Sequence, residues 1–203
     1  IGMALREQGW HVSGVDPEEN RLIAALDLGA VDATGWDPQA EISFIATPVG
    51  QIPEMATKAL AISPDGLVTD VGGVKTTIVT EIGDPRFVGG HPMAGSEQEG
   101  VEGADSAMFV DSNWVLTPTN GTDDRAFARV RSVISSLGAE VVTLPPDRHD
   151  ALVALVSHVP HLTASALMGM AAARSEEHFA VLRLAAGGFR DMTRVAAGHP
   201  DIW

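Results

Sequence analysis

The 203-residue sequence contains no cysteine, and it is poor in basic residues and in long apolar runs. The absence of cysteine excludes disulfide scaffolds, thiolate nucleophiles and zinc sites built on cysteine. The 13 Lys and Arg residues against 27 Asp and Glu give a formal net charge of −14, so we expect neither nucleic acid nor an anionic membrane as a partner. No apolar run approaches the roughly 20 residues that span a bilayer, and no signal peptide opens the sequence, which predicts a cytoplasmic protein.

The first 145 residues alternate between short apolar strands and helices. This alternation predicts an α/β domain with right-handed crossovers and a mostly parallel, doubly wound sheet covered on both faces. The predicted strands are 11–16, 43–47, 66–71, 87–90, 113–117 and 139–144, and the predicted helices are 17–28, 53–62, 74–82 and 123–137.

The pattern changes at Pro146. Residues 146–173 are rich in Ala, Leu and Met and predict one long helix, in which Pro160 should cause a kink or a local break. Shorter helical pieces follow. We therefore predict two domains, 1–145 and an all-α domain 146–203. Because residues 1–8 already read as a helix with no cap and no preceding strand, we expect further residues to precede them.

Three strand ends predict a dinucleotide site. Asp16 ends a strand where an acid can hydrogen-bond the ribose hydroxyls of NAD, and no basic residue follows it to favour NADP; an ordinary strand-ending aspartate is the alternative. Residues 70–75 (DVGGVK) form a strand end, a glycine turn and a helix start, with Asp70, Gly72 and Gly73 at the crevice. A plain turn is the alternative here. At the neighbouring strand end, residues Thr47, Pro48 and Val49 line the same crevice.

Residues 89–97 (GGHPMAGSE) carry the densest signal. His91 follows a strand within a glycine-rich loop that lacks apolar bulk, and imidazole transfers protons near neutral pH. Farther along, Ser157, His158 and His161 lie on the long helix. They favour either buried hydrogen-bonded histidines or a metal pair completed by His149 or Glu177, although Pro160 disturbs ligand geometry.

Residues 187–194 (GGFRDMTR) place Arg190 and Arg194 four residues apart on one helical face. Two guanidinium groups beside a double glycine can clamp a carboxylate. A solvated helix face, with Asp191 pairing locally, is the alternative.

These segments, together with IGMALRE (1–7), NWVLTPT (113–119) and SHVPH (157–161), occur in the order found in the prephenate dehydrogenase family, which the whole sequence resembles. The resemblance implies a Rossmann domain, a helical domain that dimerises, and NAD(P)-dependent oxidative decarboxylation of prephenate or its amino analogue arogenate. It implies a homodimer, and we expect no metal. It also implies a missing N-terminal segment that carries the first strand and the glycine loop, and further helices after Trp203.

The resemblance also implies residue roles. His91 would accept the proton of the substrate hydroxyl, and Arg194 would bind a substrate carboxylate. The implied substrate pocket contains Ser96, Glu97, Ser157, His158, His161 and Arg190. Many relatives have serine where this sequence has Gly73, so water or Ser96 would supply the hydrogen bond that the serine makes.

Two other functions remain open. A β-hydroxyacid dehydrogenase with the same two-domain plan would need a catalytic lysine on the helix between the domains, yet Lys58 and Lys75 both lie in the first domain. A non-catalytic NAD-sensing module would keep Asp16 but would have no use for His91 together with the arginine pair.

Overall fold

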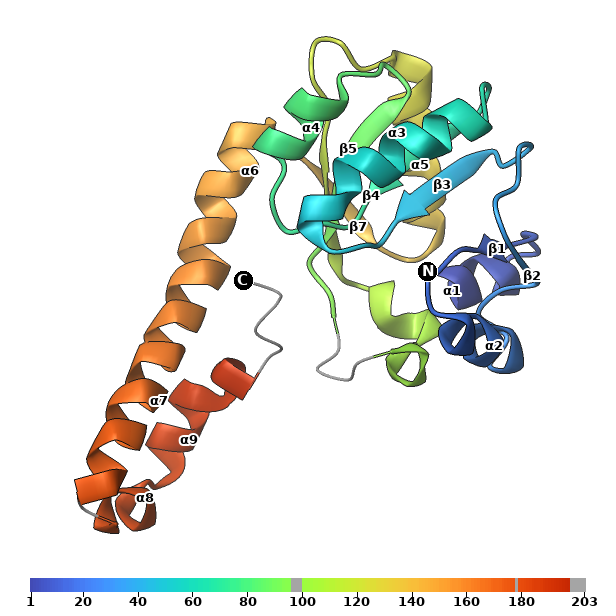
Figure 1. Ribbon diagram of the computed structural model, residues 1–203. Helices are drawn as coiled ribbons and strands as arrows, with labels where there is room; N and C mark the ends of the chain where they lie inside the picture. The colour runs from blue at the N-terminus through green and yellow to red at the C-terminus, as the bar shows by residue number, and fades with distance from the viewer. Residues whose placement is uncertain (96–99, 178, 198–203) are drawn as a thin grey trace. The chain divides into compact units, whose positions relative to one another are not determined.

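The computed structural model describes residues 1–95, 100–177 and 179–197, and it divides into two compact units, Ile1–His149 and Asp150–Trp203. The first unit holds both sheets (Figure 1). Its elements are α1 (Gly2–Glu7), β1 (Ser13–Gly14), α2 (Glu19–Asp27), β2 (Ala33–Thr34), β3 (Ile42–Ile45), η1 (Val49–Gln51), α3 (Ile52–Ile62), β4 (Leu67–Asp70), α4 (Thr76–Ile82), β5 (Phe87–Pro92), η2 (Val101–Gly103), η3 (Ser106–Phe109), β6 (Asn113–Thr117), α5 (Asp124–Ser136) and β7 (Glu140–Thr143), followed by the start of α6 (Pro146–Val153).

The main sheet has five strands in the order β3-β4-β5-β6-β7, and β1 pairs with β2 in a separate parallel ribbon. Strands β3, β4 and β5 are parallel, as are β6 and β7. The prediction of a mostly parallel sheet is confirmed for these ladders and wrong for one, because β5 and β6 run antiparallel, with His91 opposite Val115. Strand β2 was not predicted.

Both faces of the main sheet are covered by helices, as the doubly wound prediction requires. On one face α3 and α4 bury Ile52, Ala59 and Ile78 against the sheet side chains Val68 and Phe87. On the opposite face α1 and α5 contribute apolar side chains that pack with neighbouring strand residues. The buried members of this second cluster include Leu5, Val88, Trp114, Leu116, Val130 and Ile134. Because Phe87 and Val88 are consecutive, their separation onto opposite faces follows from the two-residue period of a strand.

Local sequence signals explain several helix ends. Asp123 caps α5, since its carboxylate accepts hydrogen bonds from the backbone N–H groups of Arg125 and Ala126, both at 2.9 Å. Gly83 ends α4 in a left-handed conformation with φ 58°, which glycine adopts without the steric cost of a Cβ atom. Gly83 therefore sets where the connection from α4 to β5 begins, and Asp123 sets where the connection from β6 to α5 ends.

The second unit is helical. A π-helix, η4 (Ala154–His158), separates α6 from α7 (Val159–Glu177), and α8 (Ala180–Leu184), α9 (Gly187–Thr193) and η5 (Arg194–Ala197) follow. The backbone N–H of Val159 donates to the carbonyl oxygen of Ala154, a wider turn than in an α-helix. This turn directly precedes Pro160, so the local break predicted for proline takes the form of a π-turn. Helix α7 packs against α9 and η5.

The expectation that no segment is long and apolar enough to span a bilayer is wrong for one helix. The helical stretch Pro146–Ser175 meets that length and composition, because residues 151–173 contain no Asp, Glu, Lys or Arg. Ser, Thr and His residues interrupt the apolar run without adding fixed charge. Only 11% of its most apolar window is buried among the described residues, so the helix has an apolar surface that needs a cover.

Candidate active site

His91 is the next-to-last residue of β5 and lies beside the glycine turn that follows β4. Parallel pairing of β4 with β5 brings Asp70, at the end of β4, next to Gly90. An ideal Cβ atom at Gly73 would have Cε1 and Nε2 of His91 as its nearest neighbours, both at 3.9 Å. The Nε2 edge of the half-buried imidazole therefore faces the glycine turn.

The glycines before His91 belong to the strand and not to a loop. Strand β5 extends to Pro92, two residues beyond the predicted end, and pairs Gly89 with Thr117 and Gly90 with Leu116. A Cβ atom at Gly90 would lie 2.6 Å from the carbonyl oxygen of Asp70, and one at Gly89 would lie 2.4 Å from the Thr117 hydroxyl. Both glycines therefore allow close packing of neighbouring backbone and side chains.

A second histidine contacts His91 from the start of α6. The Nδ1 atom of His91 lies 2.9 Å from Nε2 of His149, and the two rings meet edge to face with centroids 5.1 Å apart. His149 is fully buried, and its backbone N–H donates to the carbonyl oxygen of Pro145 at 2.9 Å. In the sequence, His149 could be identified only as a possible metal ligand. It lies 58 residues from His91 along the chain, so the sequence does not show that α6 begins beside β5.

A buried ion pair holds the backbone around the site. Lys75 Nζ donates to Asp70 Oδ2 and, at 2.9 Å, to the carbonyl oxygen of Gly90. The N–H groups of Gly72 and Gly90 also donate to the Asp70 carboxylate, each at 2.9 Å. Burial raises the pKa of Asp70, whereas the Lys75 ammonium and these N–H groups oppose the rise. Asp70, predicted at the crevice, is thus fully buried and bound by the site's own backbone.

The other predicted cofactor residues lie at the carboxyl ends of β1 and β3. Thr47 follows β3, and its hydroxyl oxygen is buried without a hydrogen-bond partner in the described part of the chain, while Pro48 and Val49 are exposed. An unpaired buried hydroxyl is a group that a bound ligand can satisfy. The half-buried Asp16 follows β1 and accepts a hydrogen bond from the Glu18 N–H at 2.8 Å.

The predicted substrate residues of the second unit lie on η4, α7, α9 and η5. Ser157 and His158 belong to the π-turn and His161 to the first turn of α7, and all three are half-buried. Arg190 on α9 and Arg194 at the start of η5 are exposed.

Ser96 and Glu97 lie outside the described residues. Within residues 1–95, 100–177 and 179–197, no three His, Asp or Glu side chains gather as metal ligands would.

Two family models together match nearly the whole chain. The nucleotide-binding domain of prephenate dehydrogenase matches residues 1–143, and the dimerization domain of prephenate dehydrogenase matches residues 145–203. Among curated proteins, the prephenate dehydrogenase of Bacillus subtilis is 33% identical over all of this chain and 58% of its own length. The chain thus spans under two thirds of the length of such relatives.

Solved structures agree with this assignment. The crystal structure of prephenate dehydrogenase from Aquifex aeolicus, in complex with hydroxyphenyl propionate and NAD+, is 32% identical with a TM-score of 0.92 and covers 100% of this chain and 75% of its own. Synechocystis arogenate dehydrogenase is 34% identical with a TM-score of 0.79 and covers 99% and 76%.

Proposed function

The chain belongs to the prephenate dehydrogenase family, and from this premise we propose that the protein oxidatively decarboxylates prephenate to 4-hydroxyphenylpyruvate with NAD. The observation that carries the proposal is His91, whose Nε2 edge faces the Gly73 turn while Nδ1 is engaged by His149. A half-buried imidazole with one nitrogen held and the other directed toward a ligand-binding edge is suited to proton transfer.

In the proposed reaction, Nε2 of His91 accepts the proton of the ring hydroxyl as the carbinol carbon becomes a ketone. Loss of the ring carboxylate as carbon dioxide then makes the ring aromatic. The proton held at Nε2 returns to the phenolate oxygen of the product, so no net proton is released by the substrate. NAD, when bound, accepts the hydride from the carbinol carbon.

The residues at the carboxyl ends of β1, β3 and β4 fit a dinucleotide. The Thr47 hydroxyl, which has no hydrogen-bond partner among the described residues, offers such a ligand a polar group. The exposed Pro48 and Val49 offer apolar surface, and the Gly72–Gly73 turn allows close backbone approach. Asp16 is proposed to bind the adenosine ribose. Asp70 is proposed to act through the turn that it holds, since its own oxygens are already engaged.

The substrate carboxylates are proposed to bind Arg194, with Arg190, Ser157, His158, His161, Ser96 and Glu97 completing the pocket. A guanidinium binds a carboxylate through two parallel hydrogen bonds, which fixes its orientation as well as its charge. Residues 1–145 are the proposed NAD-binding domain, and 146–203 the proposed substrate and dimerisation domain. The enzyme would act in the cytoplasm in tyrosine biosynthesis.

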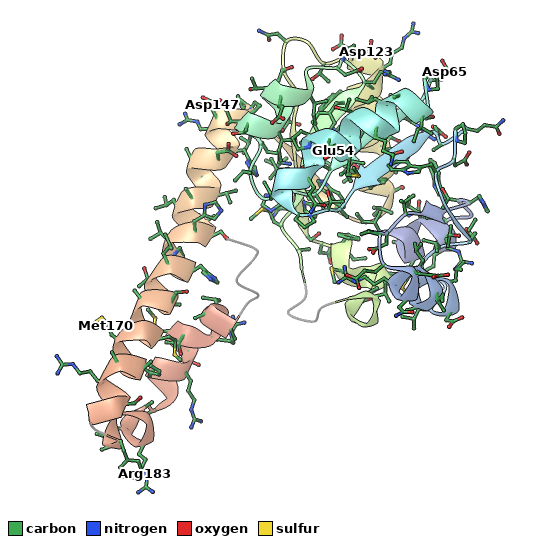
Figure 2. The ribbon with its side chains drawn as sticks, viewed as in Figure 1. Glu54, Asp65, Asp123, Asp147, Met170 and Arg183 are labelled. Atoms are coloured by element: carbon green, nitrogen blue, oxygen red, sulfur yellow. The ribbon has the colours of Figure 1, made fainter. Side chains whose placement is uncertain are left out.

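We propose that a second copy of the protein, and not a bilayer, covers the apolar helix of the second unit. Leu155, Val156, Leu162 and Met170 are each more than 60% exposed, and Met170 projects outward from α7 in Figure 2. The same helix carries Ser157, His158 and His161, and polar or ionisable side chains of this kind are rare on a lipid-facing helix surface. A homodimer removes the apolar surface from water while leaving a polar stretch for the substrate.

Reduced-nicotinamide formation by the complete protein tests the activity. NAD and NADP are each combined with prephenate and arogenate, and the proposal predicts turnover with NAD and prephenate. Turnover with arogenate alone would assign the protein to the activity named for its Synechocystis relative. A folded protein that binds NAD but forms no reduced nucleotide with either substrate would contradict the proposal and favour a different dehydrogenase or a sensing module.

A further inference from the structure

The contact between His91 and His149 has a chemical consequence that the proposed roles do not use. Nδ1 of His91 and Nε2 of His149 are 2.9 Å apart, which is hydrogen-bond distance. A neutral imidazole has one N–H donor and one acceptor nitrogen, so a single proton must lie between the two rings. If that proton is on His91, the Nε2 atom of His91 is an acceptor; if it is on His149, Nε2 of His91 is a donor.

Only the first arrangement lets His91 act as a base toward the glycine turn. A base needs an unprotonated Nε2, which with Cε1 lies 3.9 Å from the Cβ position of Gly73. With Nδ1–H donating to His149, the lone pair on Nε2 faces the site. When Nε2 gains a proton, the resulting imidazolium still donates from Nδ1 to the acceptor nitrogen of His149. In this direction the same hydrogen bond is made both by the tautomer that starts the reaction and by the cation that forms during it.

The surroundings of His149 fix its ring in place. The side chain is fully buried, the edge-to-face packing sets the angle between the rings at 75°, and the residue lies in the first turn of a helix that begins at a double proline. Because His149 belongs to the same compact unit as His91, the contact does not depend on how the second unit is placed.

We propose that His149 is a positioning residue that holds His91 in its Nδ1–H tautomer and keeps the Nε2 lone pair directed at the substrate hydroxyl. The proposal rests on the proposed function of His91 as the base. It assigns to a histidine the orienting role that an acidic residue has in many catalytic triads.

The test uses the complete protein with His149→Phe, which fills a similar volume and cannot hydrogen-bond, and His149→Gln, which can still accept from Nδ1. Nitrogen NMR of histidine-labelled protein, with the His91 signals assigned from His91→Asn, reports which ring nitrogen carries the proton. We expect Nδ1–H in the parent protein, loss of that preference in His149→Phe, and retention in His149→Gln. We expect kcat to fall about tenfold or more in His149→Phe, with the Kd for NAD unchanged.

A matched control is His11→Gln, a change at an exposed histidine of the same unit, which should alter neither the tautomer of His91 nor kcat. An Nε2–H tautomer in the parent protein, or an unchanged tautomer in His149→Phe, would overturn the proposal. If His149→Phe does not fold, His149→Gln with a shifted tautomer would overturn it equally. If the parent protein turns over no substrate, the proposed function fails, and the NMR result still decides whether His149 controls the tautomer.

Discussion

His91 is surrounded by contacts that fix its position from three directions. Its Nδ1 atom meets His149, its Nε2 atom faces the Gly73 turn, and the preceding residue, Gly90, is bonded through its N–H to Asp70 and through its carbonyl oxygen to Lys75. An imidazole held in this way loses little conformational freedom when a ligand binds, which favours the proposed proton transfer.

Replacing His91 and Arg194 should separate catalysis from binding. His91→Asn keeps a polar side chain but cannot accept the proton, so kcat should fall about 10²- to 10⁴-fold with a modest change in KM. Arg194→Ala removes a charged contact made in both the ground and transition states, so KM should rise about tenfold to hundredfold. Steady-state kinetics of both variants measures the split, and the reverse pattern would exclude both assignments.

The ion pair between Lys75 and Asp70 should matter for stability. Both side chains are fully buried, so Lys75→Met leaves a carboxylate in the core without its cation and should lower the free energy of unfolding by about 3–5 kcal/mol. Urea unfolding of the complete protein measures the change.

Two comparisons control this experiment. The double variant Asp70→Asn with Lys75→Met should recover part of the loss, because no unpaired charge remains. Arg129→Met breaks an ion pair with Glu41 whose side chains are 44% and 53% exposed, and should cost under about 1 kcal/mol. Equal losses of unfolding free energy at the two ion pairs would show that burial does not determine how much each pair contributes.

The sequence predicts some residues of the site and not others. His91 could be recognised because histidine beside glycines after a strand has few packing roles, and family motifs fixed its place. Lys75 could not, since a lysine at a helix start ordinarily faces water, and only the strand pairing shows that Gly90 and Asp70 enclose its ammonium group. His149 could be identified only as a possible metal ligand, because 58 residues separate it from His91 along the chain.

Among the elements, α1 is linked to the segment before β1 by the carboxylate of Asp32, the residue that directly precedes β2. Its pKa is lowered by the N–H of Val12 and then by Arg6, which donates to Asp32 Oδ1 at 2.8 Å. A carboxyl group with a lowered folded-state pKa stabilises the protein above its unfolded pKa, about 3.9, and this contribution is lost as pH falls through the folded value.

Asp32→Asn should therefore lower the urea midpoint by a constant amount from about pH 5.5 to pH 8. The difference from the parent protein should shrink as the pH falls below the unfolded pKa of the carboxyl group. Unfolding curves at a series of pH values test this. A difference that persists unchanged in acid would show that the carboxylate charge is not the cause.

The elements themselves were predicted more readily than their directions. Alternating apolar runs and helix-ending glycines located every strand of the main sheet within about two residues. The antiparallel direction of β6 could not be predicted. The residues of a strand give the same apolar pattern in a parallel and in an antiparallel pair, and the direction depends on the path of the chain from β5 to β6. Strand β2 was missed because its two residues give no periodicity.

At the scale of the whole molecule, the apolar helix of the second unit predicts association. The complete protein should have twice the monomer mass by light scattering at assay concentrations. Met170→Glu should weaken the dimer about tenfold or more, because it places a charge on a surface that the partner covers. Leu28→Glu, at an exposed apolar side chain of the first unit, is the matched control. A monomeric parent protein would contradict the proposed dimer.

The proposed reaction couples hydride transfer to loss of the ring carboxylate. The most direct measurement is the ratio of NADH to carbon dioxide formed from prephenate labelled at that carboxylate. The proposed reaction predicts one labelled carbon dioxide for each NADH, and the rates at which both products form should fall together in His91→Asn. NADH formed without carbon dioxide would contradict the account, because it would mean simple alcohol oxidation by a dehydrogenase of another kind.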